Sequence, residues 1–164
     1  MNKLRMRPRL TALLPTRMVC LCLLVGLLVG CGASASQPSR LTEFAIPTSQ
    51  STPLAITAGP DGNFWFAELE GNKIGRVTPS GTITEFPIPT FNSAPKGITK
   101  GPDGNLWFTE SGANKIGQIT PSGTISEFSV TTSASDPEGI TKGPDGNLWF
   151  TEETGNKIGR ITPK

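Results

Sequence analysis

The chain has 164 residues, 35% of them hydrophobic and 17% charged, which is the composition of a soluble globular protein. Fifteen basic and thirteen acidic residues give a net charge of +2, but five of the basic residues and none of the acidic ones lie in residues 1–30. The rest of the chain therefore holds ten bases against thirteen acids, a net charge of −3. Because a nucleic-acid binder needs a positive footprint, we expect no nucleic-acid partner.

Residues 1–30 have the layout of an export signal. Basic residues come first, and a 13-residue apolar run from Met18 to Gly30 follows. A membrane-spanning helix needs roughly 20 apolar residues, so this shorter run predicts export and cleavage. Cys20 and Cys22 leave with the segment, and a single cysteine, Cys31, remains. We therefore expect no disulfide and no cysteine-based metal site.

The end of the apolar run, Leu28-Val29-Gly30-Cys31, resembles the bacterial lipoprotein signal. That resemblance implies a signal peptide over residues 1–30 and lipidation of Cys31, which would hold the protein at a membrane surface outside the cytoplasm. The alternative is an ordinary cleavage site beside a chance cysteine. Residues 31–40 are small and polar after the cysteine, which predicts a flexible tether without chemistry of its own.

From residue 41 to residue 164 the chain repeats itself three times. Gly-Pro-Asp-Gly-Asn begins at Gly59, Gly101 and Gly143, and both intervals are 42 residues. A period of about 40 to 45 residues with several short strands is typical of β-propeller blades of four strands each. The abundance of Gly, Pro, Thr and Asn excludes a helical solenoid. The predicted fold is an all-β, partial or open β-propeller of three blades over residues 41–164.

The second repeat illustrates the predicted strands, which cover residues 82–88, 97–100, 105–110 and 115–120. Pro102-Asp103-Gly104 predicts a tight turn, because Pro presets φ, Asp caps the local backbone and Gly accepts positive φ. We interpret the tryptophan of each repeat as a packing residue, with stacking on a carbohydrate or aromatic ligand as the alternative. These residues are Trp65, Trp107 and Trp149.

Propellers with this pattern place the Pro-x-Gly-Ile strand innermost and the Thr-Ile-x-Glu-Phe strand outermost. Residues 41–46 should then form an outer strand, and the last blade should lack one. Because propellers have about 4 to 8 blades, three blades leave the ring open. We weigh three explanations: a truncated longer propeller, a homodimer that closes a six-bladed ring by exchanging first strands, and an open arc.

The repeats resemble the virginiamycin B lyase (streptogramin lyase) family over residues 41–164. The resemblance lies in Gly-Ile-Thr-x-Gly-Pro-Asp-Gly-Asn-Leu-Trp-Phe-Thr-Glu followed by Asn-Lys-Ile-Gly-x-Ile-Thr-Pro-Ser-Gly-Thr-Ile. It implies a seven-bladed monomer that opens cyclic depsipeptide antibiotics of the streptogramin B type by Mg²⁺-dependent elimination across the ester. It also implies a histidine base in a Pro-His motif, with Mg²⁺ held by a carboxylate two residues before the base and a Glu four residues after the Trp.

Position by position, this resemblance places Asp136 and Glu153 at the metal ligands and Glu138 at the base. The earlier blades have Lys96 and Leu54 at the position of Glu138, and these three residues are expected at the channel mouth. The sequence holds no histidine, and a Glu, with a pKa near 4.3 in isolation, is a poor general base at neutral pH. Family catalysis is therefore not expected, although Asp136 and Glu153 leave a choice between a Mg²⁺ site and a solvated acidic rim.

The remaining charged repeat positions are interpreted as structural. We expect Glu68, Glu110 and Glu152 to be hydrogen-bonding residues of the blades, and the lysines that begin Lys-Ile-Gly to be exposed charges at strand ends. Three functions remain: a lipid-anchored module that binds a small molecule or peptide, a streptogramin B lyase, and a partial copy without function. The absence of histidine favours binding over catalysis, and the missing blades favour the partial copy.

Overall fold

The computed structural model describes residues 40–163, and all regular structure in this part of the chain is β-strand. The predicted signal peptide, Cys31 and residues 32–39 of the predicted tether lie outside the described residues. Among the described residues no helix is long and apolar enough to cross a membrane.

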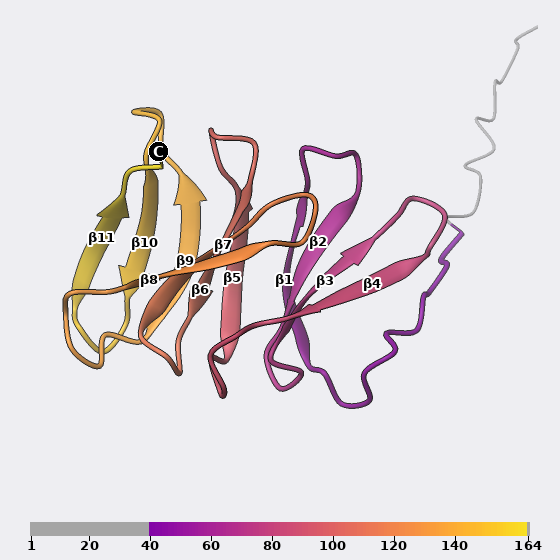
Figure 1. Ribbon diagram of the computed structural model, residues 1–164, viewed down its shortest axis with the longest axis horizontal. Coiled ribbons are helices and arrows are strands. Elements are labelled where there is room, and N and C mark those ends of the chain that lie inside the picture. The colour runs from indigo at the N-terminus through magenta and orange to yellow at the C-terminus, as the bar shows by residue number, and fades with distance from the viewer. Residues whose placement is uncertain (1–39, 164) are drawn as a thin grey trace, which may run out of the picture. The chain divides into compact units, whose positions relative to one another are not determined.

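Eleven strands form three antiparallel sheets, which are the three predicted blades (Figure 1). Blade 1 has the order β1-β2-β3-β4, blade 2 the order β5-β6-β7-β8, and blade 3 the order β9-β10-β11. The bounds are β1 Pro53–Ala58, β2 Phe64–Glu68, β3 Lys73–Val77, β4 Ile83–Pro87, β5 Pro95–Lys100, β6 Leu106–Glu110, β7 Lys115–Ile119, β8 Ile125–Ser129, β9 Pro137–Lys142, β10 Leu148–Glu152 and β11 Lys157–Ile161.

The predicted strand order is confirmed. Strands β1, β5 and β9, which carry the Pro-x-Gly-Ile pattern in blades 2 and 3, contact one another from blade to blade and are the innermost strands. Strands β4 and β8, which carry the Glu-Phe pattern, lie at the opposite edges of their sheets. Blade 3 has no such outer strand within the described residues, so the propeller is partial and not closed.

Apolar side chains fill the interfaces between blades. Trp65 and Trp107 are buried and stack on phenylalanines of the outer strands, Phe86 and Phe128, with ring centroids 5.4 and 5.5 Å apart. Burial of this kind supplies most of the stabilising free energy of a sheet packing. The interpretation of these tryptophans as packing residues is therefore confirmed, while Trp149 of the incomplete blade is only half-buried.

The Pro-Asp-Gly turn also forms as expected. Asp103 accepts hydrogen bonds from the backbone N–H of Asn105 at 3.3 Å and from Trp107 Nε1 at 3.1 Å. Gly104 has a φ of +78°, which a residue with a Cβ rarely adopts. The Asp thus joins the turn to the tryptophan that packs between blades.

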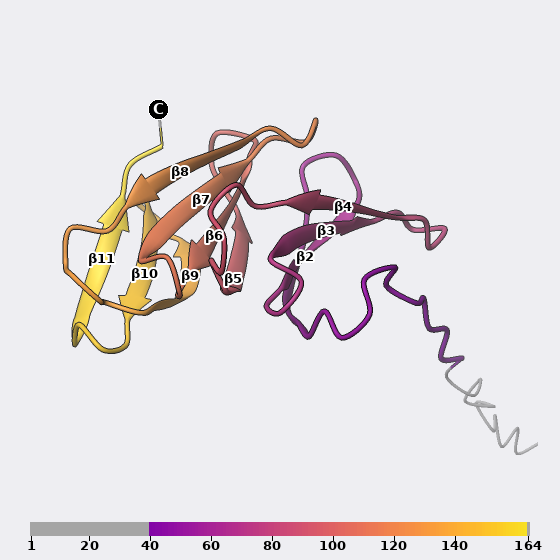
Figure 2. The same ribbon diagram turned by 60° about the horizontal axis from the view of Figure 1, so that its bottom comes forward.

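The predicted outer strand over residues 41–46 is wrong as a strand, because these residues form no sheet pairing in the structure (Figure 2). A strand is stabilised by a neighbouring strand, and within residues 40–163 no third strand of a preceding blade lies beside this segment. Phe44 nevertheless lies against Gly81, and Thr48 donates its backbone N–H to Glu85 Oε1 at 2.9 Å. The segment therefore follows the edge of blade 1.

Two lysines are also not the exposed strand-end charges that the sequence predicted. Lys73 pairs with Glu85 at 2.9 Å and Lys115 pairs with Glu127 at 3.2 Å, and all four side chains are at least partly buried. The cause is the register, since the glutamate of each outer strand lies two residue pairs away from the lysine on the strand beside it, and therefore on the same face of the sheet. Lys157 of the incomplete blade is exposed as predicted.

Candidate functional site

A cluster of four charged side chains lies where the inner strands of blades 2 and 3 begin. Lys96 is the second residue of β5, Glu138 is the second residue of β9, Asp136 precedes β9, and Glu153 follows β10. Glu153 donates its backbone N–H to the carbonyl of Asp136 at 3.1 Å. This bond fixes the two acidic residues side by side.

The backbone at Asp136 is left-handed, with a φ of +49°. The equivalent residues of the earlier blades, Thr52 and Ala94, have φ of +52° and +48°, so the conformation belongs to the repeat. Asp tolerates this region better than most residues with a side chain. The repeat already imposes this backbone conformation, and an aspartate at this position adds a carboxylate to it.

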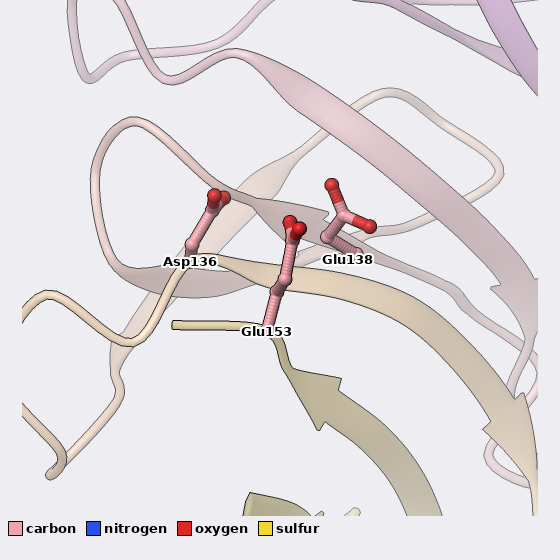
Figure 3. A group of neighbouring side chains, drawn as sticks. All are labelled: Asp136, Glu138 and Glu153. Carbon is pink, nitrogen blue, oxygen red and sulfur yellow. The ribbon is translucent and has the colours of Figure 1, made fainter. Parts of the chain in front are cut away.

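The three acidic side chains converge. Carboxylate oxygens of Asp136, Glu138 and Glu153 lie within 4.8 Å of one another, and Figure 3 shows the three groups turned to the same side of the ribbon. A hydrogen bond with Glu138, followed by the negative charges of Glu138 and Asp136, raises the pKa of Glu153. The three acidic residues that the sequence singled out therefore lie close together in the structure.

Lys96 neutralises part of this cluster. Its Nζ forms an ion pair with Asp136 at 3.3 Å and a direct hydrogen bond with Glu138. Burial lowers the pKa of Lys96, but the hydrogen bonds to Glu138 and Asp136 outweigh burial, and the net pKa is raised. The ammonium therefore stays charged at neutral pH.

Three converging carboxylates are the ligand type that Mg²⁺ prefers. However, the ammonium of Lys96 already bonds to two of them, and a cation at the same face would have to displace it. With Lys96 in this position, the residues present do not fit a resident Mg²⁺ ion.

Leu54 does not join the charged cluster, although it occupies the repeat position of Lys96 and Glu138. It lies half-exposed on blade 1 and lines an apolar hollow together with Phe44 and Ile46. Of the three expected channel-mouth residues, the structure joins Lys96 and Glu138 and places Leu54 in different, apolar surroundings.

The buried glutamates differ from their predicted role. Glu68 and Glu110 are completely buried, yet neither carboxylate oxygen accepts a hydrogen bond from the described residues. Burial, and then the charge of Glu127, raises the pKa of Glu110 to about 8. Burial, and then the charge of Glu85, raises that of Glu68 to about 7. For Glu68 and Glu110 the expectation of hydrogen-bonding residues is therefore wrong, because they are buried acids that favour the protonated form, while Glu152 leaves only Oε2 without a partner among the described residues.

Sequence reasoning missed Thr109, whose hydroxyl bonds to both inner strands beside the charged cluster. Its buried hydroxyl accepts a hydrogen bond from the Gly97 N–H at 2.9 Å and donates one to the carbonyl of Glu138 at 2.7 Å. Thr109 thereby joins β5 to β9 beside the charged cluster. The sequence signal is the variation at this repeat position, which is Ala67 in blade 1 but threonine in blades 2 and 3.

These features define a β-propeller protein with a charged cluster at the start of its inner strands. The chain belongs to the virginiamycin B lyase family, whose sequence model matches residues 33–164. It is similar to the virginiamycin B lyase of Bacillus licheniformis, with 49% identity over 44 residues, which are 27% of this chain and 15% of that protein.

Solved structures agree with this assignment. The virginiamycin B lyase from Staphylococcus aureus superimposes with a TM-score of 0.73 and 54% identity over 74% of this chain. A catalytically inactive histidine-to-alanine variant of that enzyme with quinupristin gives the same values. A streptogramin B lyase structure gives a TM-score of 0.67 and 41% identity over 75% of this chain. The chain spans 41% and 44% of the length of these two enzymes.

Proposed function

We propose that this chain is an exported, lipid-anchored binding module of the family, which holds a small molecule or peptide without catalysing a reaction. The observation that carries the proposal is the contact of Lys96 with Glu138 and Asp136. The family resemblance expects a base and a metal at this place. In this chain, Lys96 pairs with Asp136 and Glu138 at this place, and their opposite charges neutralise one another.

The chemistry of the remaining residues supports binding over catalysis. The 164 residues contain no histidine, and the S. aureus enzyme is described as catalytically inactive when one histidine becomes alanine, in a structure with quinupristin. A propeller of this family in which that histidine is replaced can therefore still be obtained in a structure together with quinupristin. The cluster offers an ammonium donor and carboxylate acceptors to polar groups of a ligand.

A depsipeptide of the streptogramin B type is the first ligand to test. The full chain, extracted in mild detergent, would be titrated with quinupristin by calorimetry, and the antibiotic would afterwards be analysed by chromatography. We expect binding, weakened by Lys96→Met and unaffected by Lys100→Met on the exposed end of the same strand. Binding without this difference, or no binding, would contradict the proposed site.

The second candidate function is a streptogramin B lyase. The observation behind it is the convergence of Asp136, Glu138 and Glu153 within 4.8 Å, because this set would offer oxygen ligands to Mg²⁺ once Lys96 had moved away. The same incubation with and without Mg²⁺ separates the two functions. We expect intact quinupristin in both cases, whereas a Mg²⁺-dependent ring-opened product would establish the lyase and overturn the non-catalytic proposal.

The proposed anchor rests on the sequence alone and has its own experiment. Cells that express the full chain would be labelled with a radioactive fatty acid and then fractionated. We expect label on the unaltered chain in the membrane fraction and none on Cys31→Ala, while Cys22→Ala should keep its label. Equal labelling of the two variants would contradict lipidation at Cys31.

A further inference from the structure

The connection between blades 1 and 2 is held from both sides by hydrogen bonds. Residues 88–94, which we call the strap, run from the end of β4 to the start of β5 (Figure 1). On the side of blade 1, Asn72 Nδ2 donates to the carbonyl of Thr90 at 3.0 Å, and Asn72 Oδ1 accepts from the N–H of Ser93 at 2.7 Å. On the side of blade 2, the N–H of Gly112 donates to the carbonyl of Ser93 at 3.0 Å. The strap therefore closes over the turn between β6 and β7.

Thr90 of the strap is bound by two charged side chains of blade 2. Glu127 Oε1 accepts from the backbone N–H of Thr90 at 3.1 Å, and Glu127 Oε2 accepts from its hydroxyl at 2.9 Å. Lys115 Nζ donates to Thr90 Oγ1 at 2.7 Å and to Glu127 Oε2 at 3.2 Å. The strap is thus held to blade 2 by a charge-assisted set of hydrogen bonds, which are stronger than neutral ones.

Glu110 lies on the same face of blade 2 as these two side chains. It pairs directly with Lys115 across β6 and β7, and Glu127 lies two residue pairs from Lys115 across β7 and β8. The Glu110 side chain is completely buried, and neither carboxylate oxygen accepts a hydrogen bond from the described residues. An ionised carboxylate without a donor is strongly disfavoured in a buried place.

A proton on Glu110 removes this conflict. Two ionised carboxylates are both acceptors, whereas a protonated carboxyl donates a hydrogen bond. Burial, and then the charge of Glu127 and a hydrogen bond with it, raises the pKa of Glu110 to about 8, while the charge of Lys115 acts in the opposite direction. Burial would also raise the pKa of Glu127, but the hydrogen bonds from Thr90 and Lys115 outweigh burial and lower it. The proton therefore belongs to Glu110, and the negative charge belongs to Glu127.

Blade 1 repeats this arrangement. Thr48 donates its backbone N–H to Glu85 at 2.9 Å, and Lys73 bonds to both Thr48 and Glu85. Glu68 is completely buried at the repeat position of Glu110, and its carboxylate oxygens likewise have no partner among the described residues. Two blades with the same four roles, 42 residues apart, indicate that the buried acid is part of the repeat.

We propose that the proton of Glu110 keeps the strap closed on blade 2, and that release of this proton to water accompanies opening of the strap at Thr90. Without the proton, two negative charges share the single ammonium of Lys115 in a buried place. If Lys115 turns to Glu110, it leaves Thr90 and Glu127, and if Glu110 turns to water, the strap has to lift. The strap leads into β5, whose second residue is Lys96, so its closure also orders the strand that carries the candidate site.

Amide hydrogen exchange at Thr90 tests this proposal. The full chain in mild detergent would be followed by NMR, and each exchange rate would be divided by that of an unstructured peptide at the same pH, which gives the protection of the amide. Opening restores the ordinary pKa of Glu110, 4.5, in place of about 8. We therefore expect the protection of Thr90 to fall by about tenfold per pH unit between pH 5 and pH 8 and to level off above pH 8.

Two variants and one added condition identify the cause. Glu110→Gln cannot ionise, so the protection of Thr90 should become independent of pH, whereas the exposed Glu70→Gln should keep the full slope. Opening of the strap alone exposes little surface, so exchange at Thr90 should not change in about 1 M urea. Exchange that rises with urea would overturn the inference, because the strap would then open only when the whole chain unfolds.

The carboxyl carbon of Glu110 gives a second reading in the unaltered chain. We expect its ¹³C resonance to titrate near pH 8 in the folded state. A carboxyl that is already ionised at about pH 6 would contradict the buried proton. Protection of Thr90 that is independent of pH, or that falls equally in Glu110→Gln, would overturn the link between this proton and the strap.

Discussion

Lys96 and Glu138 occupy the same position of successive repeats, 42 residues apart, and their side chains are in direct contact. A repeat protein would ordinarily place like residues at this position in every blade. Opposite charges here turn a repeated position into an ion pair between blades 2 and 3, and Asp136 extends it at 3.3 Å. The same pair removes a cation site that three carboxylates alone would offer.

The first prediction follows from this neutralisation. Lys96→Met removes the ammonium and leaves Asp136, Glu138 and Glu153 facing one another, and their mutual repulsion should then favour a divalent cation. We expect Mn²⁺, followed by electron paramagnetic resonance, to bind at least about tenfold more tightly than to the unaltered chain. Lys100→Met is the matched control on the same strand. Equal Mn²⁺ affinity for the two variants would show that Lys96 does not compete with a metal.

The buried acids predict a pH dependence of stability. The raised pKa of Glu110, about 8, means that the folded chain keeps a proton that the unfolded chain releases above its ordinary pKa of 4.5. The folded state then binds more protons, so the free energy of unfolding falls as the pH rises from about 4.5 to about 8. Glu68, with a pKa of about 7, acts in the same direction.

Replacement of Glu110 measures its share of this dependence. Glu110→Gln cannot ionise and keeps nearly the same side-chain shape, so urea unfolding between pH 5 and pH 8 should show a smaller loss of stability. We expect the variant to be more stable than the unaltered chain at pH 8, by on the order of a few kcal/mol at most. The exposed Glu70→Gln should keep the full pH slope. A slope unchanged by Glu110→Gln would mean that this carboxyl ionises freely in the folded state.

The repeat period made the blades and their strand order predictable, because each 42-residue unit carries its own turns and its own inner and outer strand patterns. The partners of individual charges were not predictable in the same way. Lys73 looks like an exposed strand end until β4 is known to bring Glu85 beside it. The segment 41–46 has the pattern of a strand, but pairing depends on a neighbour that the pattern cannot supply.

The residues of the candidate site were likewise predictable only in part. The family resemblance singled out Asp136, Glu138 and Glu153, and the start of β9 and the end of β10 hold these three residues side by side within blade 3. The resemblance did not place Leu54, whose surroundings depend on Phe44 and Ile46 from outside the blade. Thr109 was also missed, since a hydroxyl between two strands looks like any strand threonine until both strands are placed.

Thr109 gives the third prediction. Thr109→Val keeps the shape of the side chain but leaves the N–H of Gly97 and the carbonyl of Glu138 without their partner in a buried place. Unsatisfied buried groups cost about 1 to 3 kcal/mol, so urea unfolding should show a loss of this size. Thr151→Val is the matched control, because Thr151 is exposed and accepts a hydrogen bond from Gly139 alone. Equal losses in the two variants would show that the bridge between β5 and β9 does not stabilise the fold.

The last prediction compares two glycines at the same repeat position. A Cβ on Gly97 would clash with the backbone carbonyl of Glu138 in the next blade, and backbone cannot move aside as a side chain can. Gly97→Ala should therefore force β5 and β9 apart and lower the free energy of unfolding by about 1 to 3 kcal/mol. A Cβ on Gly139 meets no atom closer than Thr151 Oγ1 at 3.5 Å. Gly139→Ala should unfold at the same urea concentration as the unaltered chain. Unfolding of the Gly97→Ala variant at the midpoint of the unaltered chain would contradict the close approach of the two inner strands.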